Sequence, residues 1–345
     1  MMALLEKYNK KLEELAPVNT LRRTERPEGQ VVVLTGSTGS LGSYILASLL
    51  TRGDVRKVFC LNRNGDVKAQ SASFKTRGLP ASLVDDGDRA VFFQVKPMEE
   101  KLGLSKEAYA LIAQEATCIV HNAFPVNFLL NLRSFEPQLQ YLINLFRLST
   151  HSNHGATVVF VSSISAAIPA EVHEHIIPEE VLTREQAKHL LHQGYAQSKY
   201  ICERLMANYT FTLGSPAAVL RVGQVCGPLA GTGVWNISEW FPSLVLSSRF
   251  LGAVPDSISN PEIDWVPVDR LGDIIAELVS VAASEHGNPA SSRVYNVVNP
   301  AKATWDTLLP ALQAMGPLPI ISAAEWVERL EKSDKVPKLS VRTLQ

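Results

Sequence analysis

The chain has 345 residues, 46% of them hydrophobic and 19% charged, so it carries enough apolar side chains for a substantial core, and wholesale disorder is excluded. Its 33 basic and 34 acidic residues give a formal net charge of −1, which offers no general attraction to nucleic acid or to an anionic membrane. Four dispersed cysteines show no C-x-x-C spacing, and no apolar stretch reaches the roughly 18 residues of a membrane span, so we expect a soluble, cytoplasmic protein without a disulfide framework.

The first 29 residues are predicted to form a helix followed by a connector. Apolar residues recur at helical spacing through residues 3–16, which predicts an amphipathic helix. The charged, proline-containing stretch over 17–29 is either the remnant of a linker from an upstream domain or an ordinary extension. Its arginines, Arg22, Arg23 and Arg26, are interpreted as solvated linker residues rather than as a docking site.

From residue 30 onward, short continuous apolar runs alternate with helical patterns. The runs predict strands over 31–34, 57–61, 90–95, 118–121, 157–161 and 217–222. The helical patterns cover 41–50, 104–116, 134–150 and 194–213. This alternation predicts an α/β fold, a Rossmann-type doubly wound parallel sheet that occupies residues 30–226.

The texture changes after residue 226. A glycine- and proline-containing loop leads into an apolar, tryptophan-rich helical stretch that ends near Leu251. We predict a smaller, mainly helical C-terminal lobe made from 227–261 and 284–345, while about 262–283 returns to the Rossmann domain as a strand followed by a helix.

A glycine-rich segment, TGSTGSLG, lies between the first predicted strand and its helix. Glycines spaced by three allow a tight turn, close approach of the backbone to a pyrophosphate, and close packing of helix on sheet. The free N–H groups at the start of the helix then face the negative charge. The segment therefore predicts a dinucleotide site with contacts from Thr35, Gly36, Ser37, Thr38, Gly39, Ser40, Leu41 and Gly42.

Asn62 and Arg63 end the second predicted strand, about twenty residues past Gly42. A protein that prefers NAD usually places an acidic residue here, to hold the ribose 2′-hydroxyl. A guanidinium instead suits a 2′-phosphate, so we predict NADP(H) over NAD(H), with both residues in contact with the cofactor.

Tyr195 and Lys199 open a predicted helix at positions i and i+4, which lie on one helical face. An ammonium beside a phenol is expected to lower the pKa of the phenol and to make it a competent general acid. Ser162 and Ser163 end the fifth predicted strand, where a side chain faces the ligand crevice of such a sheet.

Together these residues resemble the extended short-chain dehydrogenase/reductase superfamily, and further segments resemble one branch of it, the thioester reductase domains. Those domains are terminal release domains of nonribosomal peptide synthetases and polyketide synthases, and are similar to the reductase parts of carboxylic acid reductases. The resemblance covers about residues 30 to 330. The segments that carry it are HNAFPVNF (121–128), SFEP (134–137), LRVGQVCGP (220–228), GVWN (233–236), EWFPSL (239–244) and DWVPVD (264–269).

The resemblance implies a catalytic set of Ser163, Tyr195 and Lys199, with Ser163 chosen because the hydroxyl residue of the family is the second of the pair. It implies NADPH-dependent reduction of an acyl or peptidyl thioester held on the phosphopantetheine arm of an upstream carrier domain. The product is an aldehyde, or an alcohol after a second hydride. We expect further cofactor contacts from Asn122, Ala123 and Gly223, besides those of Tyr195 and Lys199.

Substrate contacts are expected from Phe124, Asn127, Trp235 and Trp240, although core packing is the favoured interpretation of the tryptophans. No metal site is predicted, because the pair His173 and His175 lacks further ligands at recognisable spacing. Three other functions stay open: a redox-inactive domain that releases its product by Dieckmann-type cyclisation, a nucleotide-sensing binding protein, and a sugar-nucleotide epimerase or related dehydrogenase.

Overall fold

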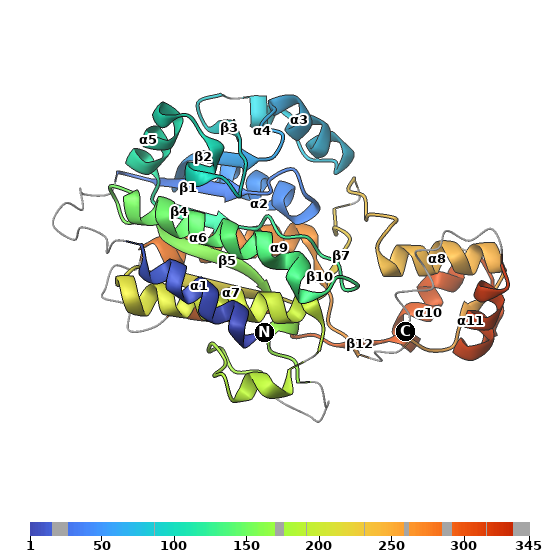
Figure 1. Cartoon of the computed structure of the whole chain (residues 1–345). Coiled ribbons are helices and arrows are strands. Elements are labelled where there is room, and N and C mark those ends of the chain that lie inside the picture. The colour runs from blue at the N-terminus through green and yellow to red at the C-terminus, as the bar shows by residue number, and fades with distance from the viewer. Residues whose placement is uncertain are drawn as a thin grey trace.

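The computed structural model describes residues 1–15, 27–85, 87–169, 176–190, 192–230, 232–258, 262–284, 292–314 and 316–333. A twisted parallel sheet lies at the centre with helices on both faces, and a smaller group of helices stands to one side (Figure 1). The predicted α/β fold with a doubly wound parallel sheet is therefore confirmed.

Among the described residues, seven strands form the main sheet in the order β11-β6-β5-β4-β1-β2-β3, and every neighbouring pair is parallel. The strand bounds are β1 Gln30–Thr35, β2 Val55–Asn62, β3 Ala90–Gln94, β4 Cys118–His121, β5 Thr157–Ser163, β6 Ala217–Val222 and β11 Arg293–Val297. The chain order reverses between β1 and β4, where Thr35 is in register with His121. In an open parallel sheet the ligand crevice forms at such a reversal, beyond the carboxyl ends of the strands.

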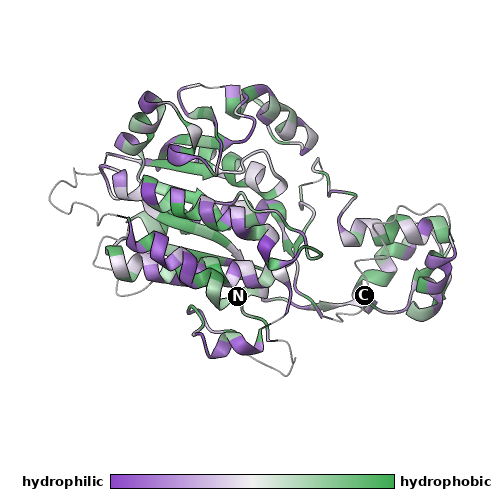
Figure 2. Cartoon of the chain, in the orientation of Figure 1, coloured by the Kyte–Doolittle hydropathy of each residue, from purple (hydrophilic) through white to green (hydrophobic). Residues whose placement is uncertain are grey.

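The strands are apolar on both faces because helices cover both (Figure 2). Helices α2 and α9 pack against each other over one face, and α5, α6 and α7 cover the other. The helix bounds in this domain are α2 Ser40–Thr51, α3 Val67–Thr76, α4 Ser82–Asp85, α5 Lys106–Glu115, α6 Glu136–His151, α7 Gly194–Leu213 and α9 Val268–Ser284. The short 3₁₀ turns are η2 Glu100–Gly103, η3 Leu132–Phe135, η4 Ile164–Ala166 and η5 Gln186–His189.

The predicted N-terminal helix is α1 (Met2–Glu13), and it packs on the outer side of α6 and α7. Leu5, Tyr8 and Leu12 are buried there, and the Tyr8 hydroxyl donates to the backbone oxygen of Glu136. This helix therefore belongs to the core of the Rossmann domain. The arginines of the predicted connector, and His173 and His175, lie outside the described residues.

The C-terminal lobe is built on α8 (Trp240–Leu251), α10 (Trp305–Ala314) and α11 (Ala323–Glu331). The indole N–H groups of Trp305 and Trp326 donate to the carbonyls of Pro255 and Ala253, at 3.0 and 3.1 Å, and fix the lobe's short strand to its helices. The minor strands pair as β7 Val225–Cys226 with β10 Val266–Pro267, β8 Val254–Pro255 with β13 Ile320–Ile321, and β9 Glu262–Ile263 with β12 Ala303–Thr304.

The structure corrects one predicted boundary. We predicted 284–345 to lie wholly in the lobe, but β11 (Arg293–Val297) is the edge strand of the main sheet, paired with β6. Only Val294 and Val297 of this strand are buried, and it contains the polar Arg293 and Asn296, so it lacks the continuous apolar run of the central strands. The return over about 262–283 corresponds to β9, β10 and α9.

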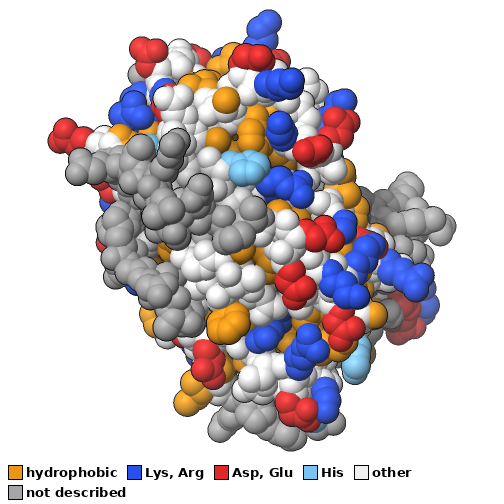
Figure 3. Space-filling view, turned by 60° about the vertical axis from the view of Figure 1, so that its left-hand side comes forward, with side chains coloured by type: hydrophobic (Ala, Val, Ile, Leu, Met, Phe, Trp, Pro, Cys, Tyr) orange, Lys and Arg blue, Asp and Glu red, His pale blue; other side chains and the backbone are white. Residues whose placement is uncertain are grey.

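Within the part of the chain that the structure describes, no helix is both long and apolar enough to cross a membrane. On the face shown in Figure 3, acidic and basic side chains are interspersed rather than gathered into a patch of one sign.

Candidate active site

The glycine-rich turn after β1 has the steric requirements that its sequence predicts. Gly36 has a φ of +73°, and a Cβ on it would lie 2.9 Å from the Cα of Ala123. A Cβ on Gly42 would lie 2.0 Å from the carbonyl oxygen of Gly36. Both contacts are closer than Cβ atoms tolerate, so these two positions require glycine. The turn therefore brings the ends of β1 and β4 and the first turn of α2 into direct backbone contact.

The start of α2 fits a dinucleotide phosphate. Gly39 is the residue before the helix and offers no side-chain cap, and both Gly39 and Ser40 are exposed. The N–H groups of a first helical turn have no partner within the helix, and the helix dipole favours negative charge at this end. Arg63, just past β2, is exposed and forms no hydrogen bond or ion pair with the other described residues. Its guanidinium is available to a 2′-phosphate.

The Thr35 hydroxyl ties the end of β1 to the segment that follows β4. It accepts hydrogen bonds from the N–H groups of Asn122 and Ala123, at 3.1 and 3.0 Å. Its own proton then goes to Nδ1 of His121, at 3.0 Å. Burial lowers the pKa of His121 to about 3, so the ring is neutral and accepts at Nδ1. Thr35, Asn122 and Ala123, all predicted cofactor contacts, thus form one fixed unit beside the glycine turn.

The Ser37 hydroxyl and the Asn62 amide nitrogen form a hydrogen bond with each other, so these two groups are already engaged within the protein. The Asn62 amide donates to the Ser37 hydroxyl at 2.7 Å, and Ser37 donates to Gln70 of α3 at 2.7 Å. The Asn62 carboxamide oxygen is buried without a partner among the described residues. Gln70, which also donates to the Ser37 carbonyl, was missed from the sequence because α3 itself was not predicted.

The structure brings Ser163, Tyr195 and Lys199 together. Ser163 ends β5, and Tyr195 and Lys199 lie in the first two turns of α7. Ser165 donates to the Ser163 hydroxyl from both its backbone N–H and its side chain, which fills the acceptor positions of Ser163 and leaves its proton to donate. Burial raises the pKa of Tyr195 to about 12, and hydrogen bonding to Ser163 opposes the shift. The phenol therefore carries its proton throughout the physiological pH range.

Lys199 differs from the sequence expectation. Its ammonium donates to the carbonyl of Val161 at 2.7 Å and lies 3.8 Å from the ring centroid of Phe124, with the Tyr195 ring centroid 5.6 Å away. Burial lowers the pKa of Lys199 to about 7. Lowering of the Tyr195 pKa by Lys199 is therefore not seen here, because desolvation of the phenol is the largest effect on it.

The two adjacent serines point to different partners. Ser162 is buried and donates to the carboxylate of Glu203 at 2.6 Å. Glu203 in turn is paired with Arg221, which donates to the carbonyls of Pro178 and Glu180 at 2.9 and 2.8 Å. This arrangement supports Ser163, rather than Ser162, as the hydroxyl that faces the site. The network was missed because its residues are far apart in the sequence.

The remaining predicted residues fall into two groups. In the first group, Phe124 lies against the predicted catalytic residues, with its ring centroid 6.0 Å from that of Tyr195. The side-chain oxygen of Asn127 accepts a hydrogen bond from the Leu129 N–H at 2.9 Å. The N–H of Gly223, just past the end of β6, donates a hydrogen bond to the carbonyl of Val297 at 3.0 Å. The second group, Trp235 and Trp240, is clustered with Phe241 and Trp265, which favours a packing role for both tryptophans.

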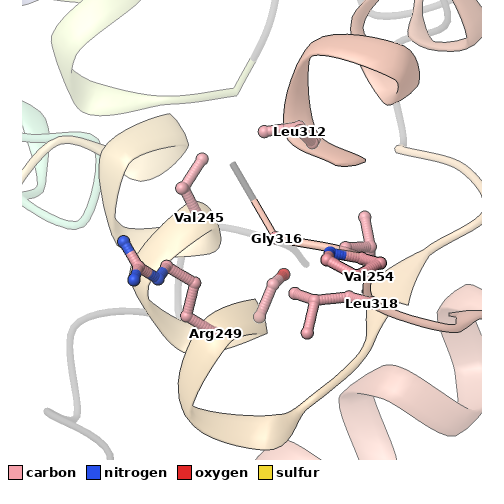
Figure 4. Close-up of a pocket in the computed structure, with 8 residues that line it drawn as sticks. Val245, Arg249, Val254, Leu312, Gly316 and Leu318 are labelled. Atoms are coloured by element: carbon pink, nitrogen blue, oxygen red, sulfur yellow. The ribbon is translucent and has the colours of Figure 1, made fainter. Parts of the chain in front are cut away.

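The lobe contains a cavity of its own, of about 200 Å³ (Figure 4). Residues of α8 and α10 line it together with Gly316, Pro317 and Leu318, and none of the predicted site residues does. Among the described residues no group of three or more His, Cys, Asp or Glu side chains is placed to hold a metal ion.

A parallel doubly wound sheet, a glycine turn at its reversal point and a Ser-Tyr-Lys cluster define the class: a Rossmann-fold protein of the extended short-chain dehydrogenase/reductase superfamily with a nicotinamide-cofactor site. A family model described as male sterility protein, an NAD-binding family, matches residues 34–275. The chain belongs to this family.

The predicted resemblance to reductase domains is confirmed by comparison with known proteins. The chain is 35% identical over 340 residues to a carboxylic acid reductase of Neurospora crassa, covering 97% of this chain and 31% of that protein. The chain thus spans about a third of this curated relative.

Solved structures show the same fold. The terminal R domain of the myxalamid PKS-NRPS pathway superposes with a TM-score of 0.78 at 23% identity, over 99% of this chain and 86% of that one. A thiolation-reductase di-domain from an archaeal non-ribosomal peptide synthetase superposes with a TM-score of 0.70 at 17% identity, over 98% and 70%.

Proposed function

We propose that the chain is an NADPH-dependent thioester reductase that converts a carrier-bound acyl or peptidyl thioester to an aldehyde and a free thiol. The observation that supports the proposal is the cluster of Ser163, at the end of β5, with Tyr195 and Lys199, in the first two turns of α7. A relative named as a carboxylic acid reductase, 35% identical to this chain, supports the proposal.

In this proposal NADPH, when bound, supplies the hydride that reaches the thioester carbon. Tyr195 gives its proton to the carbonyl oxygen, and the high pKa of the buried phenol ensures that the proton is present. Ser163 donates a hydrogen bond to the same oxygen as charge develops on it. The product of this step is a hemithioacetal.

The hemithioacetal then collapses. Its hydroxyl proton returns to the Tyr195 phenolate, the C–S bond breaks, and the thiolate leaves and takes a proton from solvent. Lys199, whose ammonium lies above the Phe124 and Tyr195 rings, stabilises the phenolate while it exists. One hydride and one solvent proton are consumed for each aldehyde formed.

We assign NADPH rather than NADH because the guanidinium of Arg63 is exposed and forms no hydrogen bond or ion pair with another described residue. We assign a phosphopantetheinylated carrier domain as partner. Support comes from the archaeal neighbour, whose title describes a thiolation domain joined to a reductase domain.

The test is NADPH oxidation with acyl thioesters, with product analysis, for the intact chain and for Tyr195→Phe. We expect at least a hundredfold loss of turnover in this variant, about the contribution of a positioned general acid. Tyr200→Phe is the matched control, because it removes a hydroxyl from the same helix whose hydrogen bond among the described residues goes to the Thr183 carbonyl, at 3.2 Å. Thioester loss without NADPH oxidation would instead identify a cyclising or hydrolytic release domain.

A further inference from the structure

The loop after β4 exposes several large apolar side chains, with the polar Asn127 among them. We name residues 124–130 the apolar loop. Its exposed fractions are 67% for Val126, 48% for Phe128, 66% for Leu129 and 37% for Leu130. Several large apolar side chains held in water on one short loop cost hydration free energy, and such a patch usually marks a binding surface.

The apolar loop is held in place by the backbone at the start of α7. A Cβ on Gly194 would lie 2.3 Å from the carbonyl oxygen of Leu130 and 2.6 Å from the nitrogen of Leu132, so the two backbones are in direct contact there. Within the loop, Asn127 accepts from the Leu129 N–H, and Asn131 caps the following 3₁₀ turn η3. These contacts fix the carboxyl-terminal end of the loop against the start of α7.

The inner end of the apolar loop reaches the catalytic tyrosine. The Phe128 ring stands edge-on to the Tyr195 ring, with centroids 5.2 Å apart and an interplanar angle of 82°. Phe124 approaches Tyr195 from another side at 6.0 Å and stacks on Phe135 at 5.8 Å. The two phenylalanines that contact the Tyr195 ring are thus neighbours in sequence of the exposed Val126 and Leu129.

The charge around the apolar loop is sparse. Between residues 124 and 135 there is no acidic side chain, and Arg133 is the single charged residue of the segment. The ammonium of Lys199 is buried and lies against Phe124, with its proton donated to Val161. A cationic acyl group would find no carboxylate from the loop, and a hydrocarbon group would release water from four exposed apolar side chains.

We propose that the apolar loop is the acyl subsite and that Phe128 determines its specificity, selecting uncharged, hydrocarbon-rich acyl groups. The inference rests on the proposed thioester reduction, because a carbonyl bonded to Tyr195 places its acyl substituent against the adjoining Phe128. Each methylene that leaves water on the loop then raises kcat/KM by about threefold to fourfold.

The experiment compares thioesters that share one thiol, N-acetylcysteamine, and differ in the acyl group: acetyl, octanoyl, and octanoyl with a terminal carboxylate. We expect the intact chain to favour octanoyl over the other two by at least about tenfold in kcat/KM. In Phe128→Ser the octanoyl-to-acetyl ratio falls by about tenfold, through KM more than kcat. Phe211→Ser, which removes a phenylalanine that is 86% exposed near the far end of α7, is the control and leaves the ratio unchanged.

Several results would overturn the proposal. The first is an octanoyl-to-acetyl ratio of kcat/KM that Phe128→Ser leaves unchanged. The second is a preference for the carboxylated octanoyl chain that Arg133→Gln removes. The third is an effect of Phe128→Ser that varies with the thiol when the acyl group is held constant. An effect confined to carrier-bound substrates would assign the loop to carrier docking instead.

Failure of thioester reduction itself is separable. If no thioester supports NADPH oxidation, calorimetric binding of a non-reducible octanoyl thioether still tests the subsite. Weaker binding to Phe128→Ser than to Phe211→Ser supports it, and equal binding refutes it.

Discussion

Glu203 and Arg221 form an ion pair in which both side chains are fully buried, with a shortest N–O distance of 2.8 Å. The pair joins α7, which carries Tyr195 and Lys199, to β6, and Ser162 completes it from β5. Arg221 also holds the carbonyls of Pro178 and Glu180, so one guanidinium fixes a surface segment to the strands beneath the site.

Removal of one partner of this pair should be costly. We expect Arg221→Met to lower the free energy of unfolding by about 3–5 kcal/mol, because it leaves the Glu203 carboxylate buried and unpaired. Urea denaturation measures this. Arg329→Met, which breaks an exposed pair with Glu325, is the control and should cost less than about 1 kcal/mol. An equal loss of unfolding free energy in the two variants would show that the buried pair contributes no more to stability than an exposed one.

Gly42→Ala should block cofactor binding, since its Cβ would meet the Gly36 carbonyl oxygen at 2.0 Å. We expect NADPH affinity to fall by at least about tenfold, equivalent to about 1.4 kcal/mol. Gly53→Ala, where a Cβ meets nothing within 4 Å, is the matched control and should bind NADPH as the intact chain does. Fluorescence titration of NADPH decides; normal binding by Gly42→Ala would remove the glycine turn from the cofactor site.

Arg63→Ser should change cofactor preference rather than activity in general. Loss of a charge-assisted contact to the 2′-phosphate should weaken NADPH binding by about tenfold to a hundredfold, with little change for NADH. Arg249→Ser, an exposed arginine of the lobe, serves as control. A parallel loss of affinity for both cofactors would mean that Arg63 does not read the 2′-phosphate.

Lys199 should make stability depend on pH. Its pKa is about 7 in the folded chain against a reference value of 10.5, so between these values the unfolded chain binds more protons. The cost of burying the ammonium is therefore complete below about pH 7 and declines as pH rises toward 10.5. Lys199→Met should be more stable than the intact chain at pH 6, with a smaller advantage at pH 9. Chemical denaturation at the two pH values tests this, and an advantage that grows with pH would contradict it.

How much the sequence predicts depends on the range of the interactions involved. The central strands β1 and β4 are continuous apolar runs, and the glycine turn and the Tyr195–Lys199 pair are local patterns with direct physical meaning. The edge strand β11 and the helix α3 were missed because their sequences mix polar and apolar residues. Contacts between distant residues, such as Ser162 with Glu203 and Gly194 with Leu130, leave no spacing that a sequence pattern could reveal.

The central claim is hydride transfer to a thioester carbon with Tyr195 as the acid. The most direct measurement supplies NADPH deuterated at the transferred position together with an acyl thioester, and examines the product by mass spectrometry. The account predicts an aldehyde with one deuterium on its former thioester carbon and an equal amount of free thiol, and no such product from Tyr195→Phe. A product that is released without deuterium while NADPH stays unoxidised would contradict the account.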